Sequence, residues 1–330
     1  MISVGIIGAG AWGTVIANML ADNGHRVVLW CYADHIATGI ANDKAHHRLP
    51  GIELSAHIQV TTTMSDCYGH DLLILGLSSS QLVAHDHAID WSAIQCPVVG
   101  LAKGIIEPKW FISEWVEERL NGVFGVLSGP NLALEIAQKK PAASVIASSD
   151  DGLNQLIQNS LSNHYFRVYT SRDIRGVECG GIFKNVFAIA AGCIDGLDLG
   201  DNAKSALITR GLVELQRLLD YFDADPSTAL GLSGLGDLIA TCSSNQSRNW
   251  QLGFRVVTTP NHEEWEQSHR GETEGVRTIR LMHELMVKES LNLPIMMAVG
   301  RLFQDSNAVP SDIIQDLMKR GLKSEFDPCG

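Results

Sequence analysis

A lysine inside an apolar segment is the first residue of this chain that suggests chemistry. Lys184 and Asn185 are the polar residues in the stretch GGIFKNVF, residues 180–187. Lysine is rarely buried unless it is paired or functional, and burial lowers its pKa toward the range useful for proton transfer near neutral pH. The alternative is a lysine whose ammonium group reaches the surface along its alkyl chain. The first interpretation predicts a general acid or base.

Two further segments follow predicted strands, where an open parallel sheet binds its ligands. Lys103 comes directly after the expected strand 97–101, and Gly129 and Asn131 come directly after the strand 123–127. We expect these residues to face one crevice, with the N–H groups of the helix that follows Asn131 available to a ligand. The alternatives are a solvated surface lysine and a simple Gly-Pro turn capped by Asn131.

Two charged residues begin helical segments further along the chain. Asp237 stands at the start of one helix, and Arg248 enters the next within the polar stretch NQSRN, residues 245–249. A guanidinium group beside a helix start can bind phosphate or carboxylate oxygens in bidentate fashion. By themselves, Asp237 fits a residue that complements the helix dipole, and Arg248 fits a surface salt bridge. The pattern leaves both alternatives open.

The elements that must position these residues begin with a glycine-rich turn. Gly8, Gly10 and Gly13 follow an apolar run at 4–7 and precede a helical pattern and a second apolar run at 27–30. In such a strand–turn–helix unit the first glycine permits the turn, the second leaves room for a pyrophosphate, and the third lets the helix lie close to the sheet. The stretch therefore predicts dinucleotide binding.

Short strand-like runs then alternate with helical patterns as far as residue 169. Further strands are expected at 58–62, 72–77, 97–101, 123–127, 143–147 and 166–169. From residue 174 onward the periodicity is helical, with helices expected at 183–193, 203–222, 235–242, 250–257, 276–289, 295–303 and 312–319. We predict an α/β chain: a doubly wound Rossmann-like domain over residues 1–172, whose later strands need not be parallel, followed by an all-α domain over residues 173–330.

The composition excludes several classes of protein. The chain has 330 residues and a net charge of -12, which argues against nucleic acid or an anionic membrane surface as the main partner. We expect no membrane insertion, because no apolar run in the sequence approaches the length of a bilayer-spanning helix. An anionic substrate would need positive groups gathered in its own pocket.

The cysteines and histidines indicate neither disulfides nor a metal site. The seven cysteines are scattered without a CxxC motif, which is typical of reduced thiols in a cytoplasmic protein. The pairs His46/His47 and His85/His87 lack the spacing and the acidic or thiol neighbours of metal ligands. We predict no bound metal.

The motifs occur through most of the chain in one order. They are GAGAWG (8–13), NGHRVVLW (23–30), AKG (102–104), SGPNLALE (128–135), GGIFKNV (180–186), NAKSALITRG (202–211), GLGDLIATC (234–242), NQSRN (245–249) and TEG (273–275). This set resembles the NAD(P)-dependent glycerol-3-phosphate dehydrogenases, and the bacterial form most closely. The lysine–asparagine pair with the GDL and SRN motifs is more specific than the glycine turn.

The resemblance implies reversible hydride transfer between a nicotinamide cofactor and C2 of sn-glycerol 3-phosphate, with dihydroxyacetone phosphate as the oxidised product. The reverse reaction would supply glycerol 3-phosphate for phospholipid synthesis. The resemblance also implies that Lys184 is the general acid/base and that Lys103 lies near both substrate and cofactor. Asp237 would hold the substrate hydroxyl or the Lys184 ammonium. We also expect a homodimer.

The resemblance further assigns two sets of binding residues. Substrate contacts are expected from Lys103, Gly129, Asn131, Lys184, Asp237, Ser247, Arg248 and Asn249. Cofactor contacts are expected from Gly8, Gly10, Ala11, Trp12, Gly13, Tyr32, Lys103, Ala133, Arg248, Glu272 and Glu274.

The chain departs from the family pattern where the ribose of the cofactor should be recognised. Trp30, Cys31 and Tyr32 offer neither the carboxylate that binds a 2′-hydroxyl nor a cation for a 2′-phosphate. Tyr32 can stack on the adenine, and Arg48 or Lys44 can reach a 2′-phosphate from the following loop. The choice between NAD and NADP stays open, with the resemblance slightly favouring NADP. Ser78 to Gln81 and Asn131 also differ from the usual family residues.

Two alternatives compete with this interpretation. A β-hydroxyacid or 6-phosphogluconate type dehydrogenase shares the two-domain plan, but its lysine and asparagine are expected one helical turn apart, whereas Lys184 and Asn185 are adjacent. A non-catalytic module that senses NAD(P) would need the glycine turn but not Lys184, Asp237 and Arg248 together.

Overall fold

An eight-stranded sheet forms the N-terminal half of the computed structural model, which describes residues 1–107, 109–259, 274–305, 308–322 and 324–325. Its strands lie in the order β3-β2-β1-β4-β5-β6-β7-β8 and are parallel except for the antiparallel pair β6 and β7. All eight expected strands are present: β1 (Ser3–Ile7), β2 (Arg26–Trp30), β3 (Ile58–Thr61), β4 (Leu72–Leu75), β5 (Val98–Gly100), β6 (Phe124–Ser128), β7 (Ala142–Ala147) and β8 (Phe166–Ser171).

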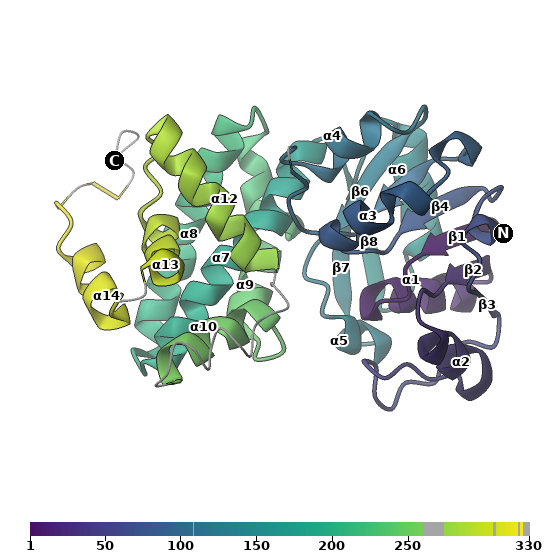
Figure 1. Ribbon diagram of the computed structural model, residues 1–330, viewed down its shortest axis with the longest axis horizontal. Coiled ribbons are helices and arrows are strands. Elements are labelled where there is room, and N and C mark those ends of the chain that lie inside the picture. Colours follow the sequence, from purple (N-terminus) through teal and green to yellow (C-terminus); the bar gives the residue numbers. More distant parts are fainter. Residues whose placement is uncertain (108, 260–273, 306–307, 323, 326–330) are drawn as a thin grey trace.

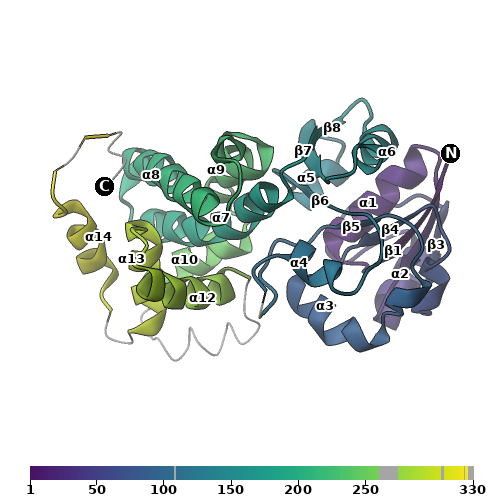
Figure 2. The ribbon, with the colours of Figure 1, turned by 90° about the horizontal axis from the view of Figure 1, so that it is seen from above.

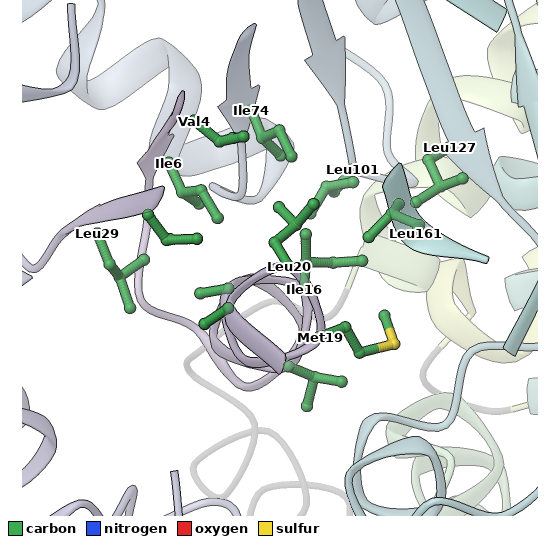
Figure 3. Close-up of a cluster of buried hydrophobic side chains, with 14 of the residues drawn as sticks. Val4, Ile6, Ile16, Met19, Leu20, Leu29, Ile74, Leu101, Leu127 and Leu161 are labelled. Atoms are coloured by element: carbon green, nitrogen blue, oxygen red, sulfur yellow. The ribbon is translucent and has the colours of Figure 1, made fainter. Parts of the chain in front are cut away.

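Helices cover both faces of this sheet. They are α1 (Ala11–Asp22), α2 (Asp34–Asp43), α3 (Ser79–His85), α4 (Ile112–Glu117), α5 (Ala133–Ala137) and α6 (Asp151–Leu161), with the short turns η1 (Met64–Cys67), η2 (Asp86–Ala88) and η3 (Trp91–Ala93). Side chains of α1, α2 and α6 pack on one face and those of α3 and α4 on the other. Figure 3 shows Ile16 and Leu20 of α1 packed with Val4, Ile6 and Ile74 of β1 and β4. The α/β doubly wound prediction is confirmed.

The C-terminal half is helical and lies beside the sheet domain (Figures 1 and 2). Strands give way to helices between the end of β8 and the start of α7, while the exact domain boundary at 172–173 stays a prediction. The elements are α7 (Ile174–Gly196), α8 (Gly200–Tyr221), η4 (Pro226–Leu230), the π-helical turn η5 (Leu232–Gly236), α9 (Asp237–Ser243), α10 (Arg248–Thr258), α12 (Glu274–Glu289), α13 (Pro294–Gln304) and α14 (Pro310–Met318).

Helix α7 begins nine residues earlier than the predicted helix at 183–193, so that prediction was wrong at its N-terminal end. Asp173 caps the helix by accepting a hydrogen bond from the backbone N–H of Gly176 at 3.0 Å. Gly180 and Gly181, which precede the predicted start, lie inside the helix. A side chain at Gly180 would overlap the carbonyl of Ser233, so glycine there lets η5 pack directly on the backbone of α7.

Helix α7 also corrects the expectation about apolar runs. It is long and apolar enough to cross a bilayer by length and composition, but 89% of its apolar window is buried inside the protein. Its side chains contact α8, α9, α10 and α12. The helix therefore forms the core of the helical domain (Figure 2).

Glycines also let α10 approach α7 closely. A side chain at Gly253 of α10 would overlap the backbone of Ile189, and one at Gly192 of α7 would overlap the carbonyl of Trp250. Each helix thus provides a glycine where the other's backbone passes. This contact fixes the position of Arg248 and Asn249, which begin α10.

We predict that Gly253→Ala lowers the free energy of unfolding by about 1 to 3 kcal/mol. The clash is with backbone atoms, which cannot turn away, so it outweighs the gain of about 1 kcal/mol that alanine gives inside a helix. Urea denaturation measures the change. The control is Gly122→Ala, whose new methyl group would make only ordinary contacts of 3.6 Å or more. A Gly253→Ala protein as stable as the wild type would refute the close-packing account.

Candidate active site

A cleft of about 690 Å³ contains residues from both domains. The sheet domain contributes the glycine turn and the segments that follow β4, β5 and β6. The helical domain contributes the middle of α7 and the N-terminal ends of α9, α10 and α12. The residues lining this active-site cleft are Gly10, Ala11, Trp12, Arg48, Gly76, Leu77, Ser78, Gln81, Leu101, Ala102, Lys103, Asn131, Leu132, Ala133, Lys184, Asn185, Asp237, Thr241, Gln246, Ser247, Arg248, Asn249 and Glu274.

The glycine turn has the geometry that a dinucleotide site requires. Gly8 has a φ of +119°, and a side chain there would come within 2.7 Å of the backbone of Gly76. A side chain at Gly13 would overlap the carbonyl of Gly8, so α1 rests directly on the turn. Gly10 is the N-cap of α1 without a side-chain cap, and the nearest atom to a side chain there is 3.9 Å away. The first N–H groups of α1 are therefore open to an anion.

Two buried donors beside this turn have no hydrogen-bond partner among the described residues. They are Nε1 of Trp12 and Nδ2 of Asn131. The other end of the Asn131 amide accepts a hydrogen bond from Oγ of Ser144 at 2.6 Å, which fixes its orientation. Buried donors are rarely left unpaired in folded proteins. Together with the open helix start, these donors fit a polar ligand of the nicotinamide dinucleotide class.

One buried carboxylate joins the two lysines. Asp237 is 2% exposed, and its Oδ2 accepts a hydrogen bond from Nζ of Lys103 at 2.7 Å. Its Oδ1 accepts one from Nζ of Lys184 at 2.5 Å. Lys103 also donates to the carbonyl of Gly129 at 2.8 Å, and Lys184 donates to Oγ1 of Thr241 at 2.8 Å. Asp237 therefore holds an ammonium group from each domain at the same site.

Burial is the main cause that lowers the pKa of Lys184. The residue is 7% exposed, and the loss of solvation lowers its pKa to about 8. The charge of Asp237 opposes this effect, and the charge of Lys103 adds to it more weakly. Burial is thus the cause that the apolar neighbours of Lys184 in the sequence had indicated. A lysine with this pKa is present in both protonation states at mildly alkaline pH.

A polar network continues from the lysines to the start of α10. Asn185 donates to the carbonyl of Lys103 at 3.4 Å and accepts from Nδ2 of Asn249 at 2.9 Å. Ser247 caps α10 by accepting from the N–H of Trp250 at 3.2 Å. Arg248 is exposed and forms no salt bridge within the described residues. This end of the active-site cleft thus offers a guanidinium group and a helix start to an anion.

Most of the predicted site residues line the cleft. The exceptions lie behind its walls, away from it, or outside the described residues. Gly8, Gly13 and Gly129 support its walls without lining it. Tyr32 is 76% exposed, contacts the rings of Trp30 and His85, and does not line the cleft, so its stacking on adenine stays a prediction. Glu272 lies outside the described residues.

Sequence reasoning missed some of the lining residues. Thr241 follows Asp237 by four residues, so the helical i, i+4 spacing could have identified it. Asn185 was noticed beside Lys184 but was given no role. The departure at residues 78–81 builds a helix start, because Ser78 and Gln81 form a capping box for α3. Both residues line the cleft.

The fold and this cleft define a dinucleotide-binding protein with a buried, carboxylate-paired lysine, and comparisons with known proteins identify the family. The profile for the NAD-dependent glycerol-3-phosphate dehydrogenase N-terminus matches residues 3–154, and the profile for the C-terminus matches residues 173–315. The chain belongs to this family.

Named relatives cover almost the whole chain. Bacterial proteins described as NAD(P)+ glycerol-3-phosphate dehydrogenase are 36% identical in Staphylococcus haemolyticus and 38% identical in Corynebacterium glutamicum, each over 98% of this chain and 100% of the relative. The crystal structure of glycerol-3-phosphate dehydrogenase from Coxiella burnetii is 31% identical. It superposes with a TM-score of 0.87 over 97% of this chain and 99% of that chain.

Proposed function

We propose that this chain interconverts sn-glycerol 3-phosphate and dihydroxyacetone phosphate with NAD or NADP, supplying glycerol 3-phosphate for phospholipid synthesis. The observation that carries the proposal is the Asp237 carboxylate, which holds Lys103 and Lys184 in the same cleft as the glycine turn. Family membership supports the substrate class.

Lys184 moves the proton in this scheme. When bound, the nicotinamide supplies a hydride to C2 during ketone reduction and takes it back during oxidation. Nζ of Lys184 gives its proton to the oxygen on C2 as negative charge develops there, and recovers the proton in the reverse reaction. A pKa of about 8 makes both directions accessible. Asp237 and Thr241 hold the amine in place through their hydrogen bonds.

The remaining residues bind and orient. We assign the phosphate end of the substrate to Arg248, Ser247 and Asn249 at the start of α10, because a helix N-terminus and a guanidinium group both favour phosphate. The backbone around Gly10 and the Trp12 and Asn131 donors would hold the cofactor, together with Ala133 and Glu274. Lys103 faces both ligands. Among the described lining residues, the four cations Arg48, Lys103, Lys184 and Arg248 outnumber the two carboxylates Asp237 and Glu274. The pocket therefore has a local positive charge in a chain of net charge -12.

The geometry argues against both alternatives. Asn185 is bonded to Asn249 and the Lys103 carbonyl, away from the Lys184 amine, unlike a lysine–asparagine pair that shares one helix face. A sensing module has no need for a buried lysine–carboxylate–lysine arrangement, which is costly to desolvate.

Two further proposals concern the cellular compartment and the oligomeric state of the enzyme. We propose a cytoplasmic homodimer. The six cysteines that the structure describes are free thiols, which supports a reducing compartment. The dimer stays a prediction, to be checked by light scattering.

The assay that tests the function follows oxidation of NADPH or NADH after addition of dihydroxyacetone phosphate. We expect turnover only with this substrate present.

Lys184→Ala should reduce kcat by about 10²- to 10⁴-fold, because the proton donor is lost. Cofactor affinity should change little. Near-normal turnover in Lys184→Ala would remove Lys184 from the proton-transfer role. No turnover in the wild type, with cofactor still bound, would favour the sensing module.

A second variant tests recognition of the phosphate. Arg248→Gln should raise the KM for dihydroxyacetone phosphate by about 10- to 100-fold, since a charged hydrogen bond to phosphate is lost. Unphosphorylated dihydroxyacetone should be used equally poorly by both proteins. Arg255→Gln is the control, because Arg255 is exposed on the last turn of the same helix and does not line the cleft. Equal effects of the two substitutions would contradict the assignment.

A further inference from the structure

The strand that usually provides the ribose-binding residue cannot do so in this chain. Trp30 and Cys31 at the end of β2 are buried, and Cys31 is only 1% exposed. Tyr32 faces solvent beside His85 and lies outside the active-site cleft. Recognition of the adenosine ribose must therefore come from another segment.

The loop after α2 folds back onto the glycine turn. His46 is buried, and its Nε2 donates to the carbonyl of Ala9 at 3.0 Å, while its Nδ1 accepts from the backbone N–H of Arg48 at 3.1 Å. These two bonds require the neutral ring with its proton on Nε2. The neighbouring Leu49 is buried in the core of the sheet domain. The backbone of Arg48 is thus tied to the turn through His46 and anchored by Leu49.

Arg48 itself belongs to the wall of the active-site cleft. It lines the cleft together with Gly10, Ala11 and Trp12, is exposed, and forms no salt bridge within the described residues. Lys44 of the same loop instead donates to the carbonyl of Ala41 at 2.6 Å and does not line the cleft.

The other described cations of the cleft are paired with Asp237 or belong to the helical domain. Lys103 and Lys184 are paired with Asp237, and Arg248 begins α10 in the helical domain. Arg48 is the cation that accompanies the glycine turn among the described lining residues. A guanidinium group binds phosphate oxygens through two parallel hydrogen bonds. The carboxylates among the described lining residues, Asp237 and Glu274, both belong to the helical domain, so neither follows β2 as a carboxylate that binds a 2′-hydroxyl would.

We propose that Arg48 binds the 2′-phosphate of NADP and gives this enzyme a preference for NADP over NAD. The inference rests on the proposed function only in requiring that the cleft binds a nicotinamide dinucleotide. His46 is the positioning residue, because it joins the Arg48 backbone to the turn that faces the pyrophosphate.

Calorimetric titration of the whole chain with NADPH and with NADH, without substrate, tests this assignment. The wild type should bind NADPH more tightly than NADH. Arg48→Gln should weaken NADPH binding by about 10- to 100-fold and change NADH binding by less than about 3-fold. Arg48→Lys keeps the charge but loses the paired donors, so its NADPH affinity should fall between the two. Lys44→Gln makes the same charge change in the same loop and should leave both affinities unchanged.

Other results would overturn the proposal in distinguishable ways. Equal weakening of NADPH and NADH in Arg48→Gln would assign Arg48 to the pyrophosphate, and no weakening of either would remove it from the site. A wild type that prefers NADH would also contradict it. Because these titrations contain no dihydroxyacetone phosphate, failure of the substrate assay would refute the proposed reaction without affecting this result.

Discussion

The buried Asp237 carboxylate is the group on which the rest of the site depends. Lys103 reaches it from the loop after β5, and Lys184 reaches it from α7, so one side chain joins the two domains at the reacting position. Charges are stable at such depth only when they are paired and hydrogen bonded, as all three are here. Without the carboxylate, two ammonium groups would face each other, and the cleft would lose the geometry that places Lys184.

The close packing around helix α7 allows Lys103, Lys184 and Asp237 to come together. Its glycines weaken the helix locally, but Gly180 admits the backbone of η5, which leads directly into Asp237, and Gly192 admits α10, which carries Arg248. Tertiary contacts therefore supply the stability that local propensity does not. The apolar length of the helix serves the same purpose, because it buries the lysine and lowers its pKa.

The sequence was sufficient for all eight strands, because strand periodicity is a local signal. The meeting of Lys103, Lys184, Asp237 and Arg248 was expected only from the resemblance of their motifs to the family. The sequence was insufficient for the start of α7, since Gly180 and Gly181 imply a break unless the packing partner is known. The lowered pKa of Lys184 was expected from its apolar neighbours in the sequence, and burial is its main cause in the structure. From the sequence, Arg48 and Lys44 were the two candidates for binding a 2′-phosphate. In the structure Lys44 is bonded within its own loop, whereas the backbone of Arg48 is held at the glycine turn through His46 and Arg48 lines the cleft.

Burial and the Asp237 contact together would give Lys184 the pKa of a proton donor and acceptor near neutral pH. Heteronuclear NMR of lysine side chains measures its pKa directly, with the signal assigned by its loss in Lys184→Arg. We expect a midpoint of about 8 in the wild type. In Asp237→Asn, where the stabilising negative charge is gone, the midpoint should be lower by about 1 to 3 pH units. A wild-type midpoint near the ordinary lysine value of 10.5, or a higher midpoint in Asp237→Asn, would contradict this expectation.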